Sequence, residues 1–229
     1  MRMVVTSVAD IWTKPSTDSE RDSQLIFGES VEVLDEEGIF SKVRSVDGVV
    51  GFIKSAILGD WSARHYKLSH QVRNKKMSFP FGSYLSRDDV ENFKIPKRYV
   101  RPIEEIFNPI KLTKMFVGIP YLWGGTSDFG FDCSGFTQRL FRYSGTEIPR
   151  NSDQQQKASD TVSDFQSALP GDLVFFKGHV AFHLGRGRIV HANGHYSRVT
   201  ETDLFDASSY SGELRNIMEK IGRFELKSA

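Results

Sequence analysis

Residues 131–145 read FDCSGFTQRLFRYSG, and this stretch predicts the helix on which the fold depends. Its apolar residues recur at helical spacing at Phe136, Leu140 and Tyr143. Asp132 is a good N-cap residue, and Gly145 suits the position just beyond the C-terminal end. The pattern therefore places Cys133, the single cysteine of the chain, in the first turn of a helix.

The position of Cys133 gives its thiol two alternative roles. In the first turn of a helix, unpaired backbone N–H groups and the positive end of the helix dipole stabilise a thiolate, so we expect a pKa below the free value of about 8.5. A lone cysteine also packs well as a small buried hydrophobic residue. The glycine-rich loop at 121–131, directly before the helix, favours the reactive role.

Four of the six histidines lie in one short region, HVAFHLGRGRIVHANGH at 179–195, which predicts two strands joined by a Gly-Arg-Gly turn. Pairing about the centre of that turn places His191 opposite Ala181 and diagonal to His179, at about 7–8 Å. A slip of one residue would move His191 to the other face of the sheet. In the favoured register, Cys133, His179 and His191 are the predicted nucleophile, general base and orienting residue.

A metal site is an alternative for these histidines, because the spacing His-x3-His-x7-His-x3-His resembles a ligand pattern. Along a strand, however, His179 and His183 are about 13 Å apart, which is too far to share one ion. We therefore expect no metal and no organic cofactor, with His183 and His195 at the surface or rim. A single cysteine also excludes disulfides within the chain and zinc sites built on two or more thiolates.

The first 58 residues predict a small β-barrel. Five short apolar runs bounded by Gly, Asp, Ser or Pro occur at 3–8, 25–27, 31–34, 42–46 and 49–53. Residues 59–102 are rich in Lys, Arg, His and Ser, and we interpret them as a linker or a reduced second module of the same kind. A helical pattern begins near Ile103, and Asn108-Pro109 predicts that this helix restarts there. It opens the third segment, residues 103–229.

Length and composition describe a globular protein of 229 residues with 39% hydrophobic content. Lys and Arg number 30 against 29 Asp and Glu, so the net charge of +1 gives no reason to expect nucleic acid or a membrane as partner. No segment has the apolar run of a secretory signal or the roughly 18 apolar residues of a membrane span. We expect a cytoplasmic protein, or a secreted one if a leader segment had been removed.

Six motifs lie in order along the chain, namely PYLWGG at 120–125, FDCSGF at 131–136, IPR at 148–150, PGDLVFF at 170–176, HVAFHLG at 179–185 and VHANG at 190–194. Together they resemble the NlpC/P60 cysteine peptidase family. The N-terminal segment resembles bacterial SH3 (SH3b) domains. The pairing looks like the γ-D-glutamyl-L-diamino acid endopeptidases, which cleave cell-wall peptides. The resemblance implies an α+β fold, with a papain-like catalytic domain at 103–229 preceded by one or two small SH3-like β-barrels.

The resemblance also implies functions for particular residues. Its Cys-His-His triad falls on Cys133, His179 and His191, and the residues that would contact the substrate or the oxyanion are Tyr121, Asp132 and Ser134. An Asp-Ser pair that holds the free N-terminal amine of the substrate in similar enzymes matches Asn151 and Ser152. An Asn keeps hydrogen bonding but lacks the charge that pairs with an ammonium, so we expect looser selection of a free amine unless Asp153 or Asp132 substitutes. Capping of the next helix is the alternative role for Asn151-Ser152.

The implied reaction is hydrolysis of the γ-D-Glu–diamino acid bond of murein-derived peptides through a thioester on Cys133, with His179 as base. Two alternatives stay open. The same fold could act as an amidase or acyltransferase on another substrate, or the chain could bind cell-wall peptides without catalysis. A murein-derived peptide is the expected partner, and the sequence indicates neither an oligomeric state nor the preferred diamino acid.

Overall fold

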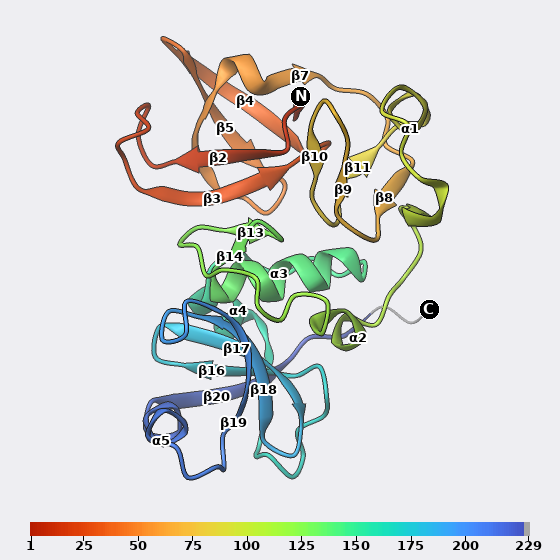
Figure 1. Ribbon diagram of the computed structural model, residues 1–229. Helices are drawn as coiled ribbons and strands as arrows, with labels where there is room; N and C mark the ends of the chain where they lie inside the picture. The colour runs from red at the N-terminus through yellow and green to blue at the C-terminus, as the bar shows by residue number, and fades with distance from the viewer. Residues whose placement is uncertain (227–229) are drawn as a thin grey trace. The chain divides into compact units, whose positions relative to one another are not determined.

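The computed structural model describes residues 1–226 and shows a mixed chain of helices and strands, which confirms the predicted α+β class (Figure 1). The chain divides into two compact units. The first contains Met1–Glu105 and Thr126–Phe129, and the second contains Ile106–Gly125 and the chain from Gly130 onward. Within the described residues, no helix is long and apolar enough to cross a membrane.

The first sixty residues form an antiparallel sheet with the strand order β3-β2-β6-β5-β4-β1-β7. Its strands are β1 (Arg2–Val4), β2 (Val8–Trp12), β3 (Arg21–Ile26), β4 (Ser30–Glu37), β5 (Phe40–Ser45), β6 (Val50–Lys54) and β7 (Leu58–Asp60), with a 3-10 turn at Ser55–Ile57. The core is aliphatic and includes Val4, Ile11, Val43 and Ile53. The prediction of one strand at 3–8 is wrong, because the chain bends at residues 5–7 and the segment contributes to two strands.

The next segment of the same unit carries a separate hydrophobic cluster. It contains β8 (Tyr66–Leu68), β9 (Val72–Arg73), β10 (Ser78–Phe79), β11 (Tyr84–Leu85), α1 (Arg87–Asn92), a 3-10 turn at Lys97–Tyr99 and β12 (Val100–Pro102). Phe27, Leu68 and Phe79 are buried together in this cluster. Thr126–Phe129 completes the unit, since the Thr126 hydroxyl donates to the Gln24 carbonyl at 3.0 Å.

A six-stranded sheet in the order β15-β20-β16-β17-β18-β19 organises the second unit. Its strands are β15 (Asp160–Val162), β16 (Leu173–Phe176), β17 (His179–Gly185), β18 (Arg188–Asn193), β19 (Arg198–Asp203) and β20 (Met218–Arg223). The helices are α2 (Pro109–Thr113), α3 (Cys133–Tyr143), α4 (Ser152–Ala158) and α5 (Ser209–Asn216), and the short strand β14 (Gly130–Phe131) precedes α3. The strand β13 (Thr126–Ser127) belongs to the first unit.

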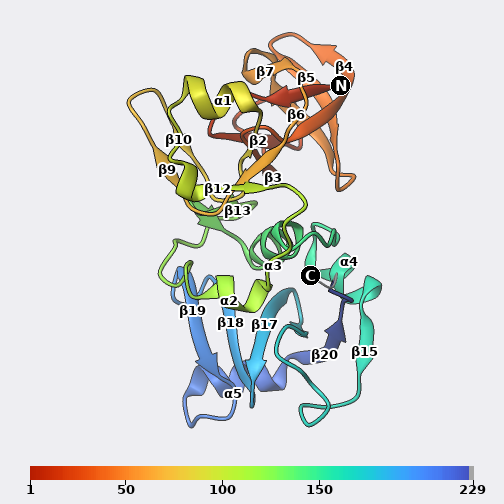
Figure 2. The same ribbon diagram turned by 90° about the vertical axis from the view of Figure 1, so that its right-hand side faces the viewer.

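Helices cover both faces of this sheet, with α3 on one side and α5 on the other (Figures 1 and 2). On the α3 side, the Phe141 and Phe182 rings stack at 5.3 Å between centroids. On the α5 side, Ala181 and Ile189 are buried with Leu214 of α5. Alternate residues of β17 therefore face two different hydrophobic layers.

The helix predicted to begin near Ile103 is absent from residues 103–108, and this prediction is wrong. Helix α2 is confined to Pro109–Thr113, and the Asn108 side chain caps it by accepting a hydrogen bond from the Ile110 N–H. Asn108 has extended backbone angles because the residue before a proline avoids the helical region. The predicted restart at Asn108-Pro109 is thus the true beginning of the helix.

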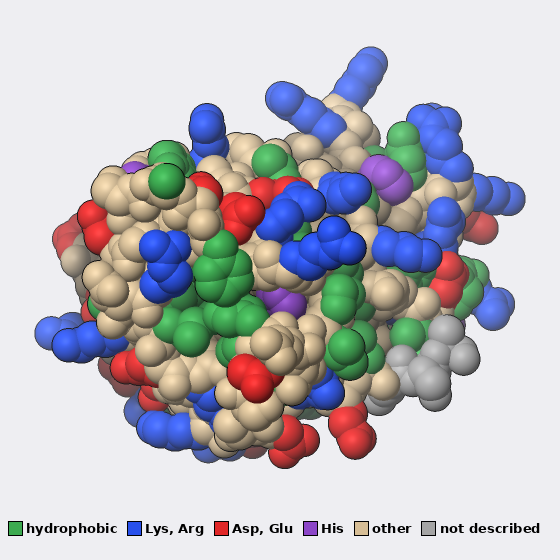
Figure 3. All heavy atoms as spheres, turned by 90° about the horizontal axis from the view of Figure 1, so that it is seen from below, with side chains coloured by type: hydrophobic (Ala, Val, Ile, Leu, Met, Phe, Trp, Pro, Cys, Tyr) green, Lys and Arg blue, Asp and Glu red, His purple; other side chains and the backbone are tan. Residues whose placement is uncertain are grey.

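The near-neutral net charge is reflected in the surface. On the face drawn in Figure 3, basic and acidic side chains both occur across the surface, and hydrophobic side chains gather near its centre.

Candidate active site

Asp132 begins the helix that carries the cysteine. Its backbone is extended, and its Oδ1 atom accepts hydrogen bonds from the Gly135 N–H at 2.6 Å and from the Ser134 hydroxyl at 3.3 Å. A carboxylate at this position satisfies an otherwise unpaired N–H group and matches the positive end of the helix. Cys133 therefore occupies the first turn of α3, as predicted, and the residue is 9% exposed.

Two glycines allow α3 to pack closely against the preceding loop. A Cβ atom on Gly135 would lie 2.1 Å from the carbonyl oxygen of Gly125. Backbone cannot yield at such a contact, so a side chain at this position is excluded without displacement of the helix. Gly125 belongs to the PYLWGG loop, and this close approach brings the loop to the beginning of α3 near Cys133.

Arg150 makes a buried ion pair with Asp132 that the sequence did not reveal. Its two terminal nitrogens donate to the two carboxylate oxygens at 3.0 and 2.5 Å, and Nη1 also donates to the Ser134 hydroxyl at 3.0 Å. The Arg150 side chain is 2% exposed. Bidentate pairing fixes the carboxylate geometrically, so Arg150 holds the cap of the cysteine helix in place.

The two histidines predicted as base and orienting residue are brought together. Strands β17 and β18 pair at Phe182↔Val190 and His183↔Ile189, which confirms the predicted register. His179 Nε2 lies 2.7 Å from His191 Nδ1, and the ring centroids are 5.0 Å apart. Because Nε2 of His179 is engaged with His191, its Nδ1 atom is the ring nitrogen left available to another group.

Cys133 is next to the beginning of β17. The backbone N–H groups of Val180 and Ser134 donate toward its sulfur. Val180 follows His179 directly, so the sulfur and the His179 ring belong to one site. The Val180 contact was not predicted, because backbone groups leave no signal in side-chain patterns.

The expectation of a lowered cysteine pKa is wrong for the free protein. Burial raises the pKa of the Cys133 thiol to about 11, and the nearby negative charge of Asp132 acts in the same direction. The two backbone hydrogen bonds and Arg150 oppose this shift but are weaker. A helix N-terminus lowers a thiol pKa only where desolvation does not exceed its effect.

Burial also keeps both histidines neutral. It lowers the pKa of His179 to about 4, although the charge of Asp132 opposes the shift. The pKa of His191 is lowered well below its ordinary value, mainly by burial and to a smaller extent by repulsion from a protonated His179. Near neutral pH the site therefore contains a thiol and two uncharged imidazoles.

The Tyr121 hydroxyl interacts electrostatically with Cys133 and Asp132. Burial, followed by the negative charges of Cys133 and Asp132, raises the pKa of Tyr121 to about 12. The phenol is therefore protonated and can donate a hydrogen bond to a substrate oxygen. The structure thus places three of the predicted contact residues around Cys133, namely Tyr121, Asp132 and Ser134.

Asn151 and Ser152 lie at the beginning of α4. In the described structure, neither side chain is hydrogen-bonded to Tyr121, Asp132 or Ser134. Asn151 has the extended backbone of an N-cap residue, but its side chain makes no capping hydrogen bond. Asn151 is exposed and Ser152 is half-buried. The structure thus leaves the Asn151 amide available to solvent or to a ligand.

The remaining histidines of the region have different surroundings. His183 is fully buried, so the prediction of a surface position is wrong for this residue. Its Nδ1 donates to the Leu169 carbonyl at 3.1 Å, and its Nε2 accepts from the Gly187 N–H at 3.2 Å. The alternation of β17 puts it on the same side as His179, where α5 and Phe165 cover the sheet. His195 is exposed, as predicted.

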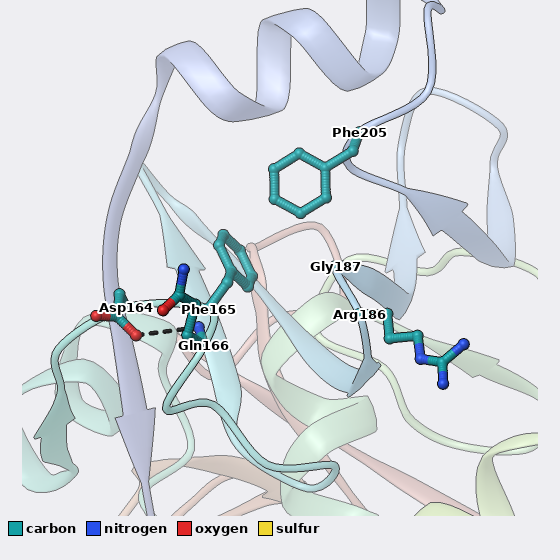
Figure 4. Close-up of a pocket in the computed structure, with 6 residues that line it drawn as sticks. All are labelled: Asp164, Phe165, Gln166, Arg186, Gly187 and Phe205. Atoms are coloured by element: carbon teal, nitrogen blue, oxygen red, sulfur yellow. Dashed lines mark hydrogen bonds between the residues drawn. The ribbon is translucent and has the colours of Figure 1, made fainter.

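A cavity of about 550 Å³ lies at the turn between β17 and β18, at the opposite end of β17 from His179 (Figure 4). Phe165 and Phe205 meet edge to face across it at 5.4 Å, and the Arg186 side chain points away from the two rings. The cavity contains no predicted site residue. Among the described residues, no group of three or more His, Cys, Asp or Glu side chains could hold a metal ion.

Comparison with known proteins agrees with this architecture. Residues 118–216 match the NlpC/P60 family, and residues 11–58 match the bacterial dipeptidyl-peptidase SH3 domain. The chain therefore combines a segment that matches a bacterial SH3 domain with a later segment that matches an NlpC/P60 domain.

The chain is homologous to two proteins named γ-D-glutamyl-L-lysine dipeptidyl-peptidase. It is 45% identical over 91 residues to the enzyme of Bacillus cereus, covering 36% of this chain and 27% of the relative. It is 28% identical over 268 aligned positions to the enzyme of Bacillus subtilis, covering 84% of this chain and 90% of the relative. The chain thus spans about a quarter of the first relative and nine-tenths of the second.

A crystal structure of an NlpC/P60 family protein from Bacillus cereus has the same fold. It superposes with a TM-score of 0.78 at 22% identity and covers 97% of this chain and 98% of that chain. NlpC2 from Trichomonas vaginalis is more distant, with a TM-score of 0.53 at 17% identity. These comparisons confirm the predicted combination of an NlpC/P60 domain with an SH3b-like segment.

Proposed function

We propose that this protein is a cysteine peptidase that hydrolyses the bond between γ-D-Glu and the diamino acid of cell-wall-derived peptides. The observation that carries the proposal is the 2.7 Å contact between His179 Nε2 and His191 Nδ1 beside a cysteine at a helix start. The name of the relatives supports γ-D-glutamyl-L-lysine as the linkage to test. No metal or organic cofactor enters the proposed reaction.

In the first step, the sulfur of Cys133 attacks the γ-carbonyl carbon while its proton moves to Nδ1 of His179. The C=O bond becomes a single bond, and its oxygen carries the negative charge. Backbone N–H groups in the first turn of α3 are suited to bind this oxyanion, and the protonated Tyr121 hydroxyl lies near them. His191 stabilises the imidazolium through its Nδ1 lone pair.

In the second step, His179 returns the proton to the leaving amine of the diamino acid. The C–N bond breaks, and the acyl group remains on Cys133 as a thioester. A water molecule then attacks the thioester with His179 as base, releasing the carboxylate product and the thiol. Protons and bonds balance over the cycle, with one water consumed for each bond cleaved.

The uncharged resting state agrees with this sequence of steps. With the pKa of Cys133 at about 11 and that of His179 at about 4, proton transfer in the free protein is unfavourable. A substrate that accepts the developing charge on its carbonyl oxygen makes the transfer part of bond formation. The thiol is thereby protected from reaction before a substrate is bound.

The test is mass spectrometry of products from L-Ala-γ-D-Glu-L-Lys, with the α-linked isomer as control substrate. We expect cleavage between Glu and Lys by the wild type and none by Cys133→Ala or His179→Gln. His65→Gln is the matched control, since His65 is exposed and belongs to the first unit. Absence of cleavage by the wild type, or retained cleavage by Cys133→Ala, would refute the proposal in favour of binding without catalysis or another substrate.

The proposal includes looser selection of a free N-terminal amine than in enzymes with an acidic residue at position 151. Asn151 is exposed and its amide offers hydrogen bonds without charge. We expect N-acetylated substrate to be cleaved by the wild type with a modest loss of kcat/KM, and Asn151→Asp to favour the free amine. Strict rejection of the acetylated peptide would contradict this part of the proposal.

A further inference from the structure

We infer that Thr202 is a positioning residue that fixes the tautomer of His191. The inference rests on the proposed function, because it assigns a part of the same relay. Thr202 lies on the edge strand β19, and its Oγ1 atom is 3.1 Å from His191 Nε2. Three side chains thus form a hydrogen-bonded row, from His179 through His191 to Thr202.

The direction of hydrogen bonding along this row decides whether His179 can act as a base. To accept the proton of Cys133, neutral His179 needs a lone pair on Nδ1 and therefore carries its proton on Nε2. That proton points at His191 Nδ1, so this nitrogen must be unprotonated and accept the hydrogen bond with its lone pair. His191 then carries its own proton on Nε2, and this N–H needs an acceptor, which is the Thr202 oxygen.

The opposite direction gives an inactive site. If His191 carried its proton on Nδ1, it would donate to Nε2 of His179, and His179 would present an N–H to the sulfur. Such an imidazole cannot accept the thiol proton. Because His191 is fully buried, water cannot supply the missing partner at Nε2 from another side. The group facing His191 Nε2 therefore selects the tautomer.

The surroundings of Thr202 make it an acceptor toward His191. Thr202 is half-buried and lines a polar groove of about 250 Å³, whose other lining residues are Tyr196, Arg198, Thr200, Glu201, Asp203, Asp206 and Ser208. The hydroxyl hydrogen can point into this groove, toward solvent and carboxylates, while a lone pair faces His191.

Within residues 1–226, neither Thr200 nor Tyr210 offers a substitute acceptor. The Thr200 hydroxyl, on the same face of β19, is engaged by the Asn193 side-chain amide at 2.8 Å. On its flank, His191 meets the ring of Tyr210 from α5, with centroids 6.1 Å apart and planes 20° apart. This aromatic contact orients the His191 ring but accepts no in-plane hydrogen bond. Thr202 is therefore the group that can select the tautomer.

The experiment compares Thr202→Val, which keeps the shape and removes the acceptor, with Thr202→Ser, which keeps the hydroxyl. We expect Thr202→Val to lower kcat about 10- to 100-fold with little change in KM, because a buried N–H loses its partner. Thr202→Ser should restore most of the rate. Thr200→Val is the matched control on the same strand face and should stay near the wild-type kcat. Thr202→Ala replaces the valine variant if that variant does not fold.

Nitrogen NMR of ring-labelled histidine gives a readout that needs no substrate. We expect the wild type and Thr202→Ser to show His191 protonated on Nε2, and Thr202→Val to shift toward the Nδ1 form. A Thr202→Val protein that keeps both the Nε2 form and the wild-type kcat would overturn the inference. If the wild type cleaves no γ-D-Glu peptide, the proposed function fails, while the tautomer measurement still decides the inference.

Discussion

Arg150 binds both carboxylate oxygens of Asp132, at 3.0 and 2.5 Å, inside the second unit. The two side chains are 2% and 10% exposed. Asp132 in turn caps the helix that begins at Cys133, so a residue seventeen positions after Cys133 controls the geometry of the first turn of that helix. The pair therefore has two effects: Asp132 caps the helix, and the charges of both residues act on the pKa of the Cys133 thiol.

Replacing Arg150 with methionine should destabilise the protein by about 3–5 kcal/mol, because it leaves the Asp132 carboxylate buried and unpaired. Arg150→Lys should recover part of this loss, since a lysine keeps the charge but not the bidentate geometry. Urea unfolding measures both. Arg188→Met is the control, because the Arg188–Glu201 pair is solvent-exposed and should contribute at most about 1 kcal/mol. Equal losses for the two methionine variants would contradict the assignment.

Gly135→Ala should destabilise the protein and reduce activity, although alanine is the better helix former. Its Cβ would lie 2.1 Å from the Gly125 carbonyl oxygen, so the helix would have to move away from the loop. Gly212→Ala in α5 is the matched control, because the nearest atom to its Cβ is 3.8 Å away. There we expect a gain of about 0.5–1 kcal/mol in the free energy of unfolding. A stabilised Gly135→Ala protein would show that the helix can shift at little cost.

Cys133 should react slowly with iodoacetamide in the folded protein. Burial raises its pKa from 9.0 to about 11, so the thiolate fraction near pH 7 falls by about 100-fold relative to an unfolded chain. The measurement is the rate of carbamidomethylation with and without denaturant, followed by mass spectrometry. The rate for the folded protein should rise steadily with pH between 7 and 10. A fast reaction at pH 7 would mean that the site holds a thiolate before substrate is bound.

Stability should fall as the pH drops from 6.5 toward 4. His179 has a pKa of about 4 when folded and the ordinary value of 6.5 when unfolded, so the unfolded chain binds more protons in this window. His179 alone should remove about 2 kcal/mol between pH 6.5 and pH 5, and His191 acts in the same direction. Urea unfolding at a series of pH values tests this.

The variant His179→Gln should weaken this pH dependence, whereas His195→Gln, which alters an exposed ring, should leave it unchanged. Identical slopes for the wild type and His179→Gln would show that His179 is not buried in its neutral form.

Local patterns were sufficient to predict several parts of the candidate site. The cap Asp132 and the helical spacing after it placed Cys133 in the first turn of α3. The turn at Gly185–Gly187 and the two-residue period of a strand placed His179 beside His191 in the correct register. Both depend on interactions between residues close in sequence, where residue type determines backbone geometry.

Other parts depended on segments that meet only in the folded chain. His183 was predicted at the surface, yet the sheet is covered on both faces and its ring is buried beneath Phe165. A helix was expected from Ile103 because its apolar spacing is helical, while the proline at 109 keeps Asn108 extended and fixes the beginning of the helix there. Periodicity reports which residues prefer burial, but not which second layer covers them.

The sequence by itself determined the position of Cys133 in the first turn of a helix and the pairing of the two histidines, because caps, turns and strand periods act over a few residues. The combination of an SH3 domain with an NlpC/P60 domain followed from the resemblance of the motifs to known families. Only the tertiary structure decided the protonation of the site. The pKa of Cys133 is raised by burial, the Asp132 carboxylate is held by Arg150, and the acceptor at His191 comes from Thr202 on another strand. Desolvation and pairing depend on what surrounds a group in space, and separate segments of the chain supply those surroundings.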